Sequence, residues 1–413
     1  MRALWAQVGA LLVAVAILFA GNGLHASLLA VNGSMDGFPL ALIGALMSAY
    51  FTGFILGCRF APSIIQTVGH IRTFTALASI ASAVALAHAL ISAPGVWIAF
   101  RVVSGFCLAG LVMILESWFN ARATSETRGR LLSVYRIVDF GAIALGQALL
   151  TLADPRGFTL FALISILISL ALVPVALTRS DAPEPTAATR FSLTKVFQTA
   201  PLAAYGCFAS GLINASVFAL GPVFIQKQGF HANEIALFMT AVILGGVAAQ
   251  WPVGVLSDRI DRRFVIFLVA LAGSIAGFAL FDPVAMALPH DHAYFFAVIG
   301  FFFGMPTFSL FGAALAQGND RVTDGRFVEM NSGLLMLYGI GAVIGPLIAA
   351  STMTSEGPSG LFVFTVVVNL LLLFLSLVRL LFGKRVAQRR RTRILSRSTP
   401  VIFQIDAQRS RDE

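Results

Sequence analysis

The chain has 413 residues, of which 58% are hydrophobic and only 11% are charged, against roughly 25% charged residues in ordinary soluble domains. So few polar residues cannot cover a water-soluble globule of this length, whereas a bilayer accommodates an apolar exterior. The net charge of +9 comes largely from short segments between apolar runs and from the residues after Phe382. It therefore indicates membrane topology, and we expect no nucleic-acid partner.

Apolar runs of about 20 residues, long enough to cross a bilayer, recur along the whole chain. The first could be mistaken for a cleaved signal peptide, but its apolar character continues to Val31 and predicts a retained helix. We predict an all-α membrane protein with twelve transmembrane helices. The predicted spans are 7–31, 38–60, 71–92, 96–118, 132–153, 157–178, 199–225, 232–256, 264–286, 293–316, 329–353 and 360–383.

The polar segment over residues 179–198 has no spanning run and divides the spans into six plus six. We therefore predict an N-terminal six-helix bundle over 1–178, a cytoplasmic linker over 179–198 and a C-terminal six-helix bundle over 199–383. Residues 384–413 are predicted to form a basic cytoplasmic tail.

Basic residues are distributed very unequally between the two faces of this arrangement. With the N-terminus in the cytoplasm, the outer face receives only Arg156 and Lys227, and the other basic residues collect on the cytoplasmic side. The positive-inside rule then predicts a multi-pass protein of a bacterial inner membrane with both termini in the cytoplasm.

Two segments 192 positions apart carry the most specific pattern. The first, between the eighth and ninth spans, runs Gly254-Val-Leu-Ser-Asp258-Arg259-Ile-Asp-Arg262-Arg263. The second, between the second and third spans, begins at Pro62, carries Gln66 and Gly69 at the matching positions, and has Arg72 one position beyond the equivalent of Arg263. The first segment resembles the signature loop of the major facilitator superfamily, G-x-x-x-D-R-x-G-R-R, with Asp261 in place of the second glycine.

Further features agree with this resemblance. Arg101-Val-Val-Ser-Gly105 in the fourth span is similar to the family's R-x-x-x-G motif, and Arg128-Gly129-Arg130 before the fifth span answers Asp324-Gly325-Arg326 before the eleventh. The Gly-His-Ile-Arg segment and Arg-Gly-Arg resemble the bacterial YcaD-like branch. The resemblance implies a secondary active transporter whose two bundles rock about a central cavity.

The resemblance also implies a conformational latch at the two repeated segments. The Asp258 segment should contact the start of the fifth span near Arg130 and Tyr135. The Gln66 segment should contact the eleventh near Glu329, more weakly because Gln66 carries no charge. The alternative is that Asp258 and its arginines only fix the topology. Five residues are predicted to serve helix packing. The glycines let helices approach closely and the proline favours a bend: Gly141, Gly146, Gly341, Gly345 and Pro346.

Ionisable residues at membrane depth are costly and mark functional sites. The candidates for proton coupling are Asp139, Arg101, Glu116 and His25. Asp139 is predicted to carry the proton or, alternatively, to pair with Arg136 or Arg130. By depth we expect Arg101 near His25, which could titrate or simply pack, and we expect Glu116 near Arg130 or Arg136.

Polar residues near the middle of the membrane are candidates to line the substrate cavity, namely Asn22, Asn214, Gln147 and Gln250. Each could instead make a hydrogen bond between helices. Few charges lie near the presumed cavity, which favours neutral or amphipathic substrates.

The function predicted is transport of a small molecule by alternating access, coupled to protons, either as efflux of amphipathic compounds or as metabolite transport. The chain has no phosphate-binding motif for ATP, no metal-ligand cluster and no disulfide spacing, so we expect no enzyme activity, cofactor or metal. A receptor on a transporter scaffold, without flux, is the alternative. We expect a monomer in the lipid bilayer.

Overall fold

The computed structural model describes residues 2–122, 128–176, 192–281, 293–322 and 326–382. The predicted tail 384–413, together with Asp324 and Gly325, lies outside these residues. Twelve segments of the described part are helical, long and apolar enough to cross a membrane, which confirms the predicted number of spans.

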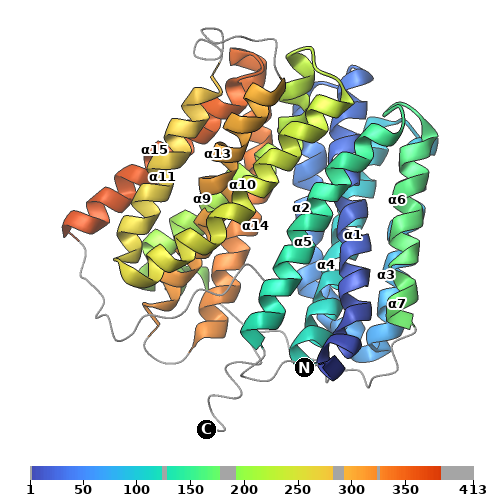
Figure 1. Cartoon of the computed structure of the whole chain (residues 1–413), viewed down its shortest axis with the longest axis horizontal. Coiled ribbons are helices and arrows are strands. Elements are labelled where there is room, and N and C mark those ends of the chain that lie inside the picture. The colour runs from blue at the N-terminus through green and yellow to red at the C-terminus, as the bar shows by residue number, and fades with distance from the viewer. Residues whose placement is uncertain (1, 123–127, 177–191, 282–292, 323–325, 383–413) are drawn as a thin grey trace. The chain divides into compact units, whose positions relative to one another are not determined.

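The helices, most of which are labelled in Figure 1, follow the predicted spans in order. They are α1 (Arg2–Met35), α2 (Leu40–Val68), α3 (His70–Leu90), α4 (Pro94–Arg122), α5 (Arg128–Leu149), α6 (Phe158–Leu170), α7 (Leu172–Ala176), α8 (Leu193–Thr199), α9 (Pro201–Lys227), α10 (Ala232–Arg259), α11 (Arg262–Ala279), α13 (Ala293–Asn319), α14 (Phe327–Glu356) and α15 (Gly360–Phe382). A short 3-10 helix, Leu150–Leu152, continues α5, and α6 with α7 forms the sixth span.

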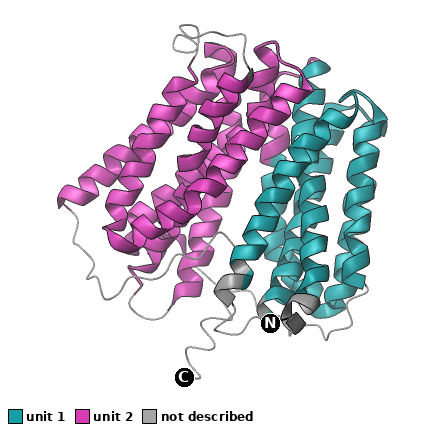
Figure 2. Cartoon of the chain, viewed as in Figure 1, with its two compact units in different colours: residues 1–36, 49–188, 401–413 teal, residues 37–48, 189–400 magenta. Residues whose placement is uncertain are grey.

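The chain divides into two compact units (Figure 2). Of the described residues, the first unit comprises 2–36, 49–122 and 128–176, and the second comprises 37–48, 192–281, 293–322 and 326–382. The start of α2 thus belongs to the second unit. The predicted domain boundaries stay a prediction, because a division by compactness is a different criterion from the division by repeat.

Each unit repeats the same pattern of helix packing. In the first unit α1 packs on α5, and α3 packs on both α4 and α6. In the second unit the helices at the equivalent places do the same: α9 packs on α14, and α11 packs on both α13 and α15. The repeat read from the two signature segments therefore extends to the packing inside each unit.

Glycines set the closest of these approaches, because helix backbones meet where no side chain intervenes. A Cβ added at Gly146 of α5 would lie 2.9 Å from the backbone nitrogen of Leu24, and one added at Gly345 of α14 would lie 2.7 Å from the Cα of Leu212. Gly341 packs on the same helix, α9, and the packing role predicted for these glycines stays a prediction.

Gly141 differs from the other three glycines, and its predicted packing role stays a prediction. This residue is exposed, and no atom of the described structure lies within 4 Å of a Cβ built there. The α1 contact of α5 runs through Ile143, which lies against Gly23, and through Gly146. Gly141 is about 200° from Ile143 around the helix at 3.6 residues per turn, so it faces away from α1. The bend predicted at Pro346 stays a prediction, and α14 runs as one helix from Phe327 to Glu356.

The two signature segments are mostly helical, which corrects the loops expected from sequence. Helix α2 continues through Pro62 to Val68, so only Gly69, with φ of 91°, separates it from α3. Helix α10 likewise includes Gly254 and Asp258, and α11 begins at Arg262. The physical reason is that helix interiors satisfy backbone hydrogen bonds wherever no residue forces a break.

Candidate functional site

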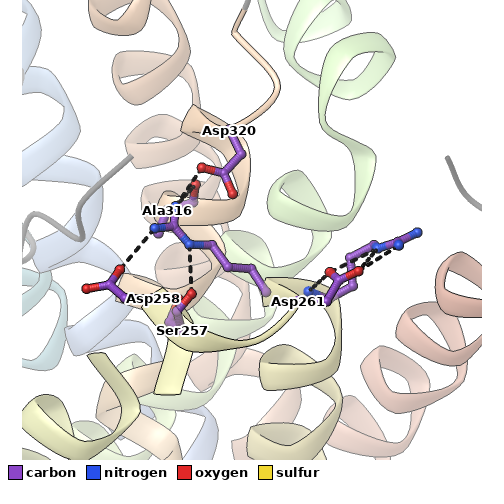
Figure 3. Close-up of polar contacts among 7 residues, drawn as sticks. Ser257, Asp258, Asp261, Ala316 and Asp320 are labelled. Carbon is purple, nitrogen blue, oxygen red and sulfur yellow. Dashed lines mark hydrogen bonds and ion pairs between the residues drawn. The ribbon is translucent and has the colours of Figure 1, made fainter. Parts of the chain in front are cut away.

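A charged cluster in the second unit gathers Ser257, Asp258, Ala316 and Asp320 (Figure 3), and Arg262 donates to all four. Its side chain is only 2% exposed. The guanidinium donates to Asp320 Oδ1 at 2.7 Å, to the Ala316 carbonyl at 2.8 Å and to Asp258 Oδ1 at 3.2 Å. It also donates to the Ser257 carbonyl at 3.3 Å. One planar cation thus joins the end of α10, the start of α11 and the end of α13.

Asp261, the departure from the family pattern, caps helix α11. Its carboxylate accepts a hydrogen bond from the backbone nitrogen of Arg263 at 3.0 Å, as an N-cap residue does. The same carboxylate pairs with the guanidinium of Arg263, at 2.7 Å for the shortest contact. Arg263 also donates to the carbonyl of Arg379 on α15 at 2.7 Å, so the cap ties α11 to α15.

Asp320 is the member of this cluster that the sequence did not reveal. It directly follows α13 and is 9% exposed. The signal for Asp320 in the sequence is its position, an acidic residue beside Arg321 at the end of the tenth span. The sequence alone does not single it out, because a residue just outside an apolar run is ordinarily solvated.

The predicted latch residues lie where α10 ends in the second unit and where α2 ends and α3 begins in the first. Asp258 is 47% exposed and Arg259 is exposed, whereas Gly254 is half-buried with no atom within 4 Å of an added Cβ. In the first unit Gln66 and Arg72 are exposed on either side of Gly69. The contacts predicted with the start of the fifth and eleventh spans stay predictions, and the side chain of Arg130 lies outside the description.

A second cluster lies in the first unit, where α4 meets α5. Asp139 is 5% exposed and pairs with Arg136 at 2.9 Å, one of the two pairings expected for it. Glu116, 2% exposed, accepts from the hydroxyl of Tyr135 at 3.5 Å. The guanidinium carbon of Arg136 lies 5.4 Å from the centre of the Tyr135 ring, so contacts link the four side chains into one largely buried group.

Arg101 lies in a third cluster of the same unit and is 2% exposed. Its guanidinium carbon is 4.3 Å from the centre of the Tyr50 ring, a cation–π contact. The Tyr50 hydroxyl in turn donates to Asn22 Oδ1 at 3.3 Å. Asn22, one of the predicted cavity residues, thus has a hydrogen-bond partner within the chain.

His25 lies in the electrostatic field of Arg101, as its depth predicted. The ring of His88, which the sequence did not single out, meets that of His25 edge-on at 5.0 Å between ring centres. His88 Nδ1 lies 2.8 Å from the Val84 carbonyl, while the Nε2 atoms of both histidines have no hydrogen-bond partner in the described structure.

The remaining cavity candidates differ in their surroundings. Gln147 is fully buried between α5 and α1, accepting from the Ser27 hydroxyl and donating to the Gly23 carbonyl at 3.1 Å. Gln147 therefore makes hydrogen bonds between two helices, the alternative to substrate contact given above for the cavity candidates. Asn214 is 1% exposed and donates to Ser210 at 3.4 Å, and Gln250 is half-buried. Among the described residues no group of three or more His, Cys, Asp or Glu side chains could hold a metal.

Comparison with known proteins gives the family. The model of the Major Facilitator Superfamily matches residues 9–322 and 229–405, in two overlapping stretches. The MFS-type transporter YcaD of Escherichia fergusonii is 28% identical over 344 residues, which are 82% of this chain and 87% of that protein. YcaD of Salmonella typhi is 26% identical over 341 residues, 82% of this chain and 87% of that one.

Solved structures of transporters share the fold. A point mutant of the nucleoside transporter NupG has a TM-score of 0.75 at 12% identity, over 89% of this chain and 98% of its own. The D-xylose-proton symporter has a TM-score of 0.72 at 13% identity, over 93% and 98%. With the family model across the chain, the twelve spans and the repeated packing, the chain belongs to the major facilitator superfamily, whose members are multi-pass membrane transporters and not enzymes.

Proposed function

We propose that this protein couples the movement of a small neutral or amphipathic molecule to the movement of protons, by alternating access. The observation that carries the coupling is the buried group of Glu116, Tyr135, Arg136 and Asp139 in the first unit. Its described side chains hold two carboxylates and one arginine. Protonation of either carboxylate would remove its charge, and the neutral form is favoured at low dielectric.

The topology proposed with this function places both termini in the cytoplasm of a bacterium, with the chain in the inner membrane. The support is the distribution of basic residues, of which only Arg156 and Lys227 fall on the outer face. In this orientation Asp139 and the Arg262 cluster both lie toward the cytoplasmic ends of their helices.

The Arg262 cluster is proposed to be the fixed part of the conformational latch. Arg262 holds the ends of α10, α11 and α13 as one block, and Asp258 at its edge is half exposed. A block with one exposed carboxylate suits a contact that forms in one state and releases in the other. The weaker latch at Gln66 would follow from its missing charge.

The test is transport into proteoliposomes under an imposed pH gradient. The probes are nucleosides, D-xylose and amphipathic cations, which include the substrate classes in the names of NupG and the D-xylose-proton symporter. For Asp139→Asn and Glu116→Gln we expect gradient-driven accumulation to fall to the level without a gradient. Exchange of labelled for unlabelled probe should continue, because exchange needs no net proton movement.

Asp154→Asn is the matched control, since it removes one carboxylate from an exposed position between the 3-10 helix Leu150–Leu152 and α6. It should leave accumulation unchanged. Undiminished accumulation in both cluster variants would remove these carboxylates from the coupling. Absence of flux for every probe in the wild type would instead favour the receptor alternative.

A further inference from the structure

Asn22 lies near the middle of the first span, with 14 residues of that span before it and 13 after. The glycines on either side of it contact other helices of the first unit. A Cβ added at Gly21 would lie 3.3 Å from the side chain of Leu167 on α6, and one added at Gly23 would lie 3.1 Å from the Cα of Ile143 on α5. Successive residues are about 100° apart around a helix, so Asn22 faces neither α5 nor α6.

The amide of Asn22 has one hydrogen bond within the described residues. Its Oδ1 atom accepts from the hydroxyl of Tyr50 on α2 at 3.3 Å. The side chain is half-buried, and no other group of the described structure bonds to it. With Oδ1 occupied in this way, the two N–H groups of Nδ2 remain available to a partner from outside the chain.

Helix α4 fixes the direction of the Tyr50 hydroxyl. Tyr50 is 7% exposed, and the guanidinium carbon of Arg101 lies 4.3 Å from the centre of its ring. The two backbones also meet, since a Cβ added at Gly105 of α4 would lie 2.9 Å from the carbonyl carbon of Tyr50. Through its hydroxyl, Tyr50 therefore holds the amide of Asn22 in one orientation. A donor oriented in advance loses less conformational freedom when a ligand binds.

An amide with available N–H groups is costly in lipid at this depth. Hydrocarbon offers no acceptor, and a polar group without a hydrogen bond is strongly unfavourable there. The half-exposed side of Asn22 should therefore face water or a polar solute. Polar groups that face such a path in the middle of a membrane mark the route of a substrate.

The available group is a donor, and this selects the class of ligand. Nδ2 pairs with an acceptor oxygen, such as that of a carbonyl or a hydroxyl group. An amphipathic cation without an oxygen atom would leave the donor unpaired when it displaces water, which disfavours its binding.

We propose that Asn22 Nδ2 donates a hydrogen bond to an acceptor oxygen of a polar, neutral substrate, and that Tyr50 is a positioning residue that acts through Asn22. The inference rests on the proposed transport function. It narrows the substrate from neutral or amphipathic molecules to neutral molecules that carry acceptor oxygens.

The first experiment measures whether position 22 faces water. In the full chain with its three cysteines replaced by alanine, Asn22→Cys is labelled in membranes with a small polar methanethiosulfonate reagent. The matched control is Ile80→Cys, because Ile80 is apolar, 45% exposed and at the middle of α3. We expect Asn22→Cys to react about 10-fold faster or more, since the reactive thiolate forms in water and not in hydrocarbon.

The second experiment measures binding and not flux, through the rise in Tm of the full chain in detergent. The probes are D-xylose and uridine, which carry acceptor oxygens, and tetraphenylphosphonium, which carries none. We expect an oxygen-bearing probe to bind the wild type more tightly than tetraphenylphosphonium does. Asn22→Leu should weaken that binding about 10-fold through the lost hydrogen bond. Asn22→Asp should weaken it as well, because aspartate keeps the acceptor for Tyr50 and lacks the donor.

Two further variants separate the proposed roles from structural damage. Asn369→Leu is the matched control, since it removes a buried amide whose Nδ2 already donates to the Thr365 carbonyl at 3.0 Å, and it should bind the probe as the wild type does. Tyr50→Phe keeps the ring beside Arg101 and loses the hydroxyl. It should weaken binding about 3-fold in the wild type and leave the affinity of Asn22→Leu unchanged, because Tyr50 acts through Asn22.

Three results would overturn the proposal. They are labelling of Asn22→Cys no faster than that of Ile80→Cys, wild-type affinity of Asn22→Leu for the oxygen-bearing probe, and a wild type that binds neither D-xylose nor uridine. A Tyr50→Phe effect that persists in Asn22→Leu would remove the positioning role. Binding that depends on Asn22, without accumulation driven by a pH gradient, would support this inference and contradict the proposed proton coupling.

Discussion

The Arg262 cluster permits a graded prediction of stability. Arg262→Met would leave Asp320 buried beside carbonyl oxygens without its cation, and removing one partner of a buried pair costs about 3–5 kcal/mol. Asp320→Asn keeps the shape and one acceptor but loses the charge, so the cost is that of a hydrogen bond to a charged group, about 1.5–3 kcal/mol. Arg262→Lys should fall between wild type and Arg262→Met, because an ammonium group cannot make all four contacts.

The assay is thermal unfolding of the purified chain in detergent at a fixed heating rate. At roughly 2–4 °C per kcal/mol for a unit of this size, Arg262→Met should lower Tm by about 6–20 °C and Asp320→Asn by about 3–12 °C. The exposed Asp36→Asn is the matched control and should leave Tm unchanged.

The double variant Arg262→Met/Asp320→Asn tests the pairing itself. Because the two side chains interact directly, its loss of stability should be smaller than the sum of the single losses. Additive losses, or an Asp320→Asn variant as stable as Asp36→Asn, would refute the assignment of Asp320 as the buried partner of Arg262.

Three further predictions concern packing and capping. Gly53→Ala should destabilise by about 1–3 kcal/mol, since its Cβ would meet the Val102 backbone. Gly141→Ala should not lower Tm, because alanine favours the helix at an open position, and equal losses in the two variants would contradict the packing. Asp261→Ala should cost about 1–2 kcal/mol in thermal unfolding and Asp261→Asn less, because asparagine also caps helices; the reverse order would exclude the capping role. Gln147→Leu should cost about 1–2 kcal/mol through the lost α1–α5 hydrogen bonds and leave the apparent affinity of any transported probe unchanged, whereas a changed affinity would favour a cavity role.

The repeat shows which features of helix packing the sequence predicts and which it does not. The 192-residue offset between Gln66 and Asp258 also relates Gly53 to Gly245. Both glycines bring α-helices into backbone contact, Gly53 with Val102 of α4 and Gly245 with Phe301 of α13. The sequence held this recurrence, but the partners of the two glycines lie far along the chain. Only the folded bundle identifies them.

The spans, their number, the two halves and the basic face followed from sequence alone, because the length of an apolar run and the placement of charge are properties of contiguous residues. Tertiary structure decided which side chains meet. Asp320 reaches Arg262, His88 meets His25, and Gly141 faces away from α1, none of which a run of residues encodes. These contacts depend on how each helix is rotated about its axis against its neighbours, and packing over the whole bundle determines that rotation.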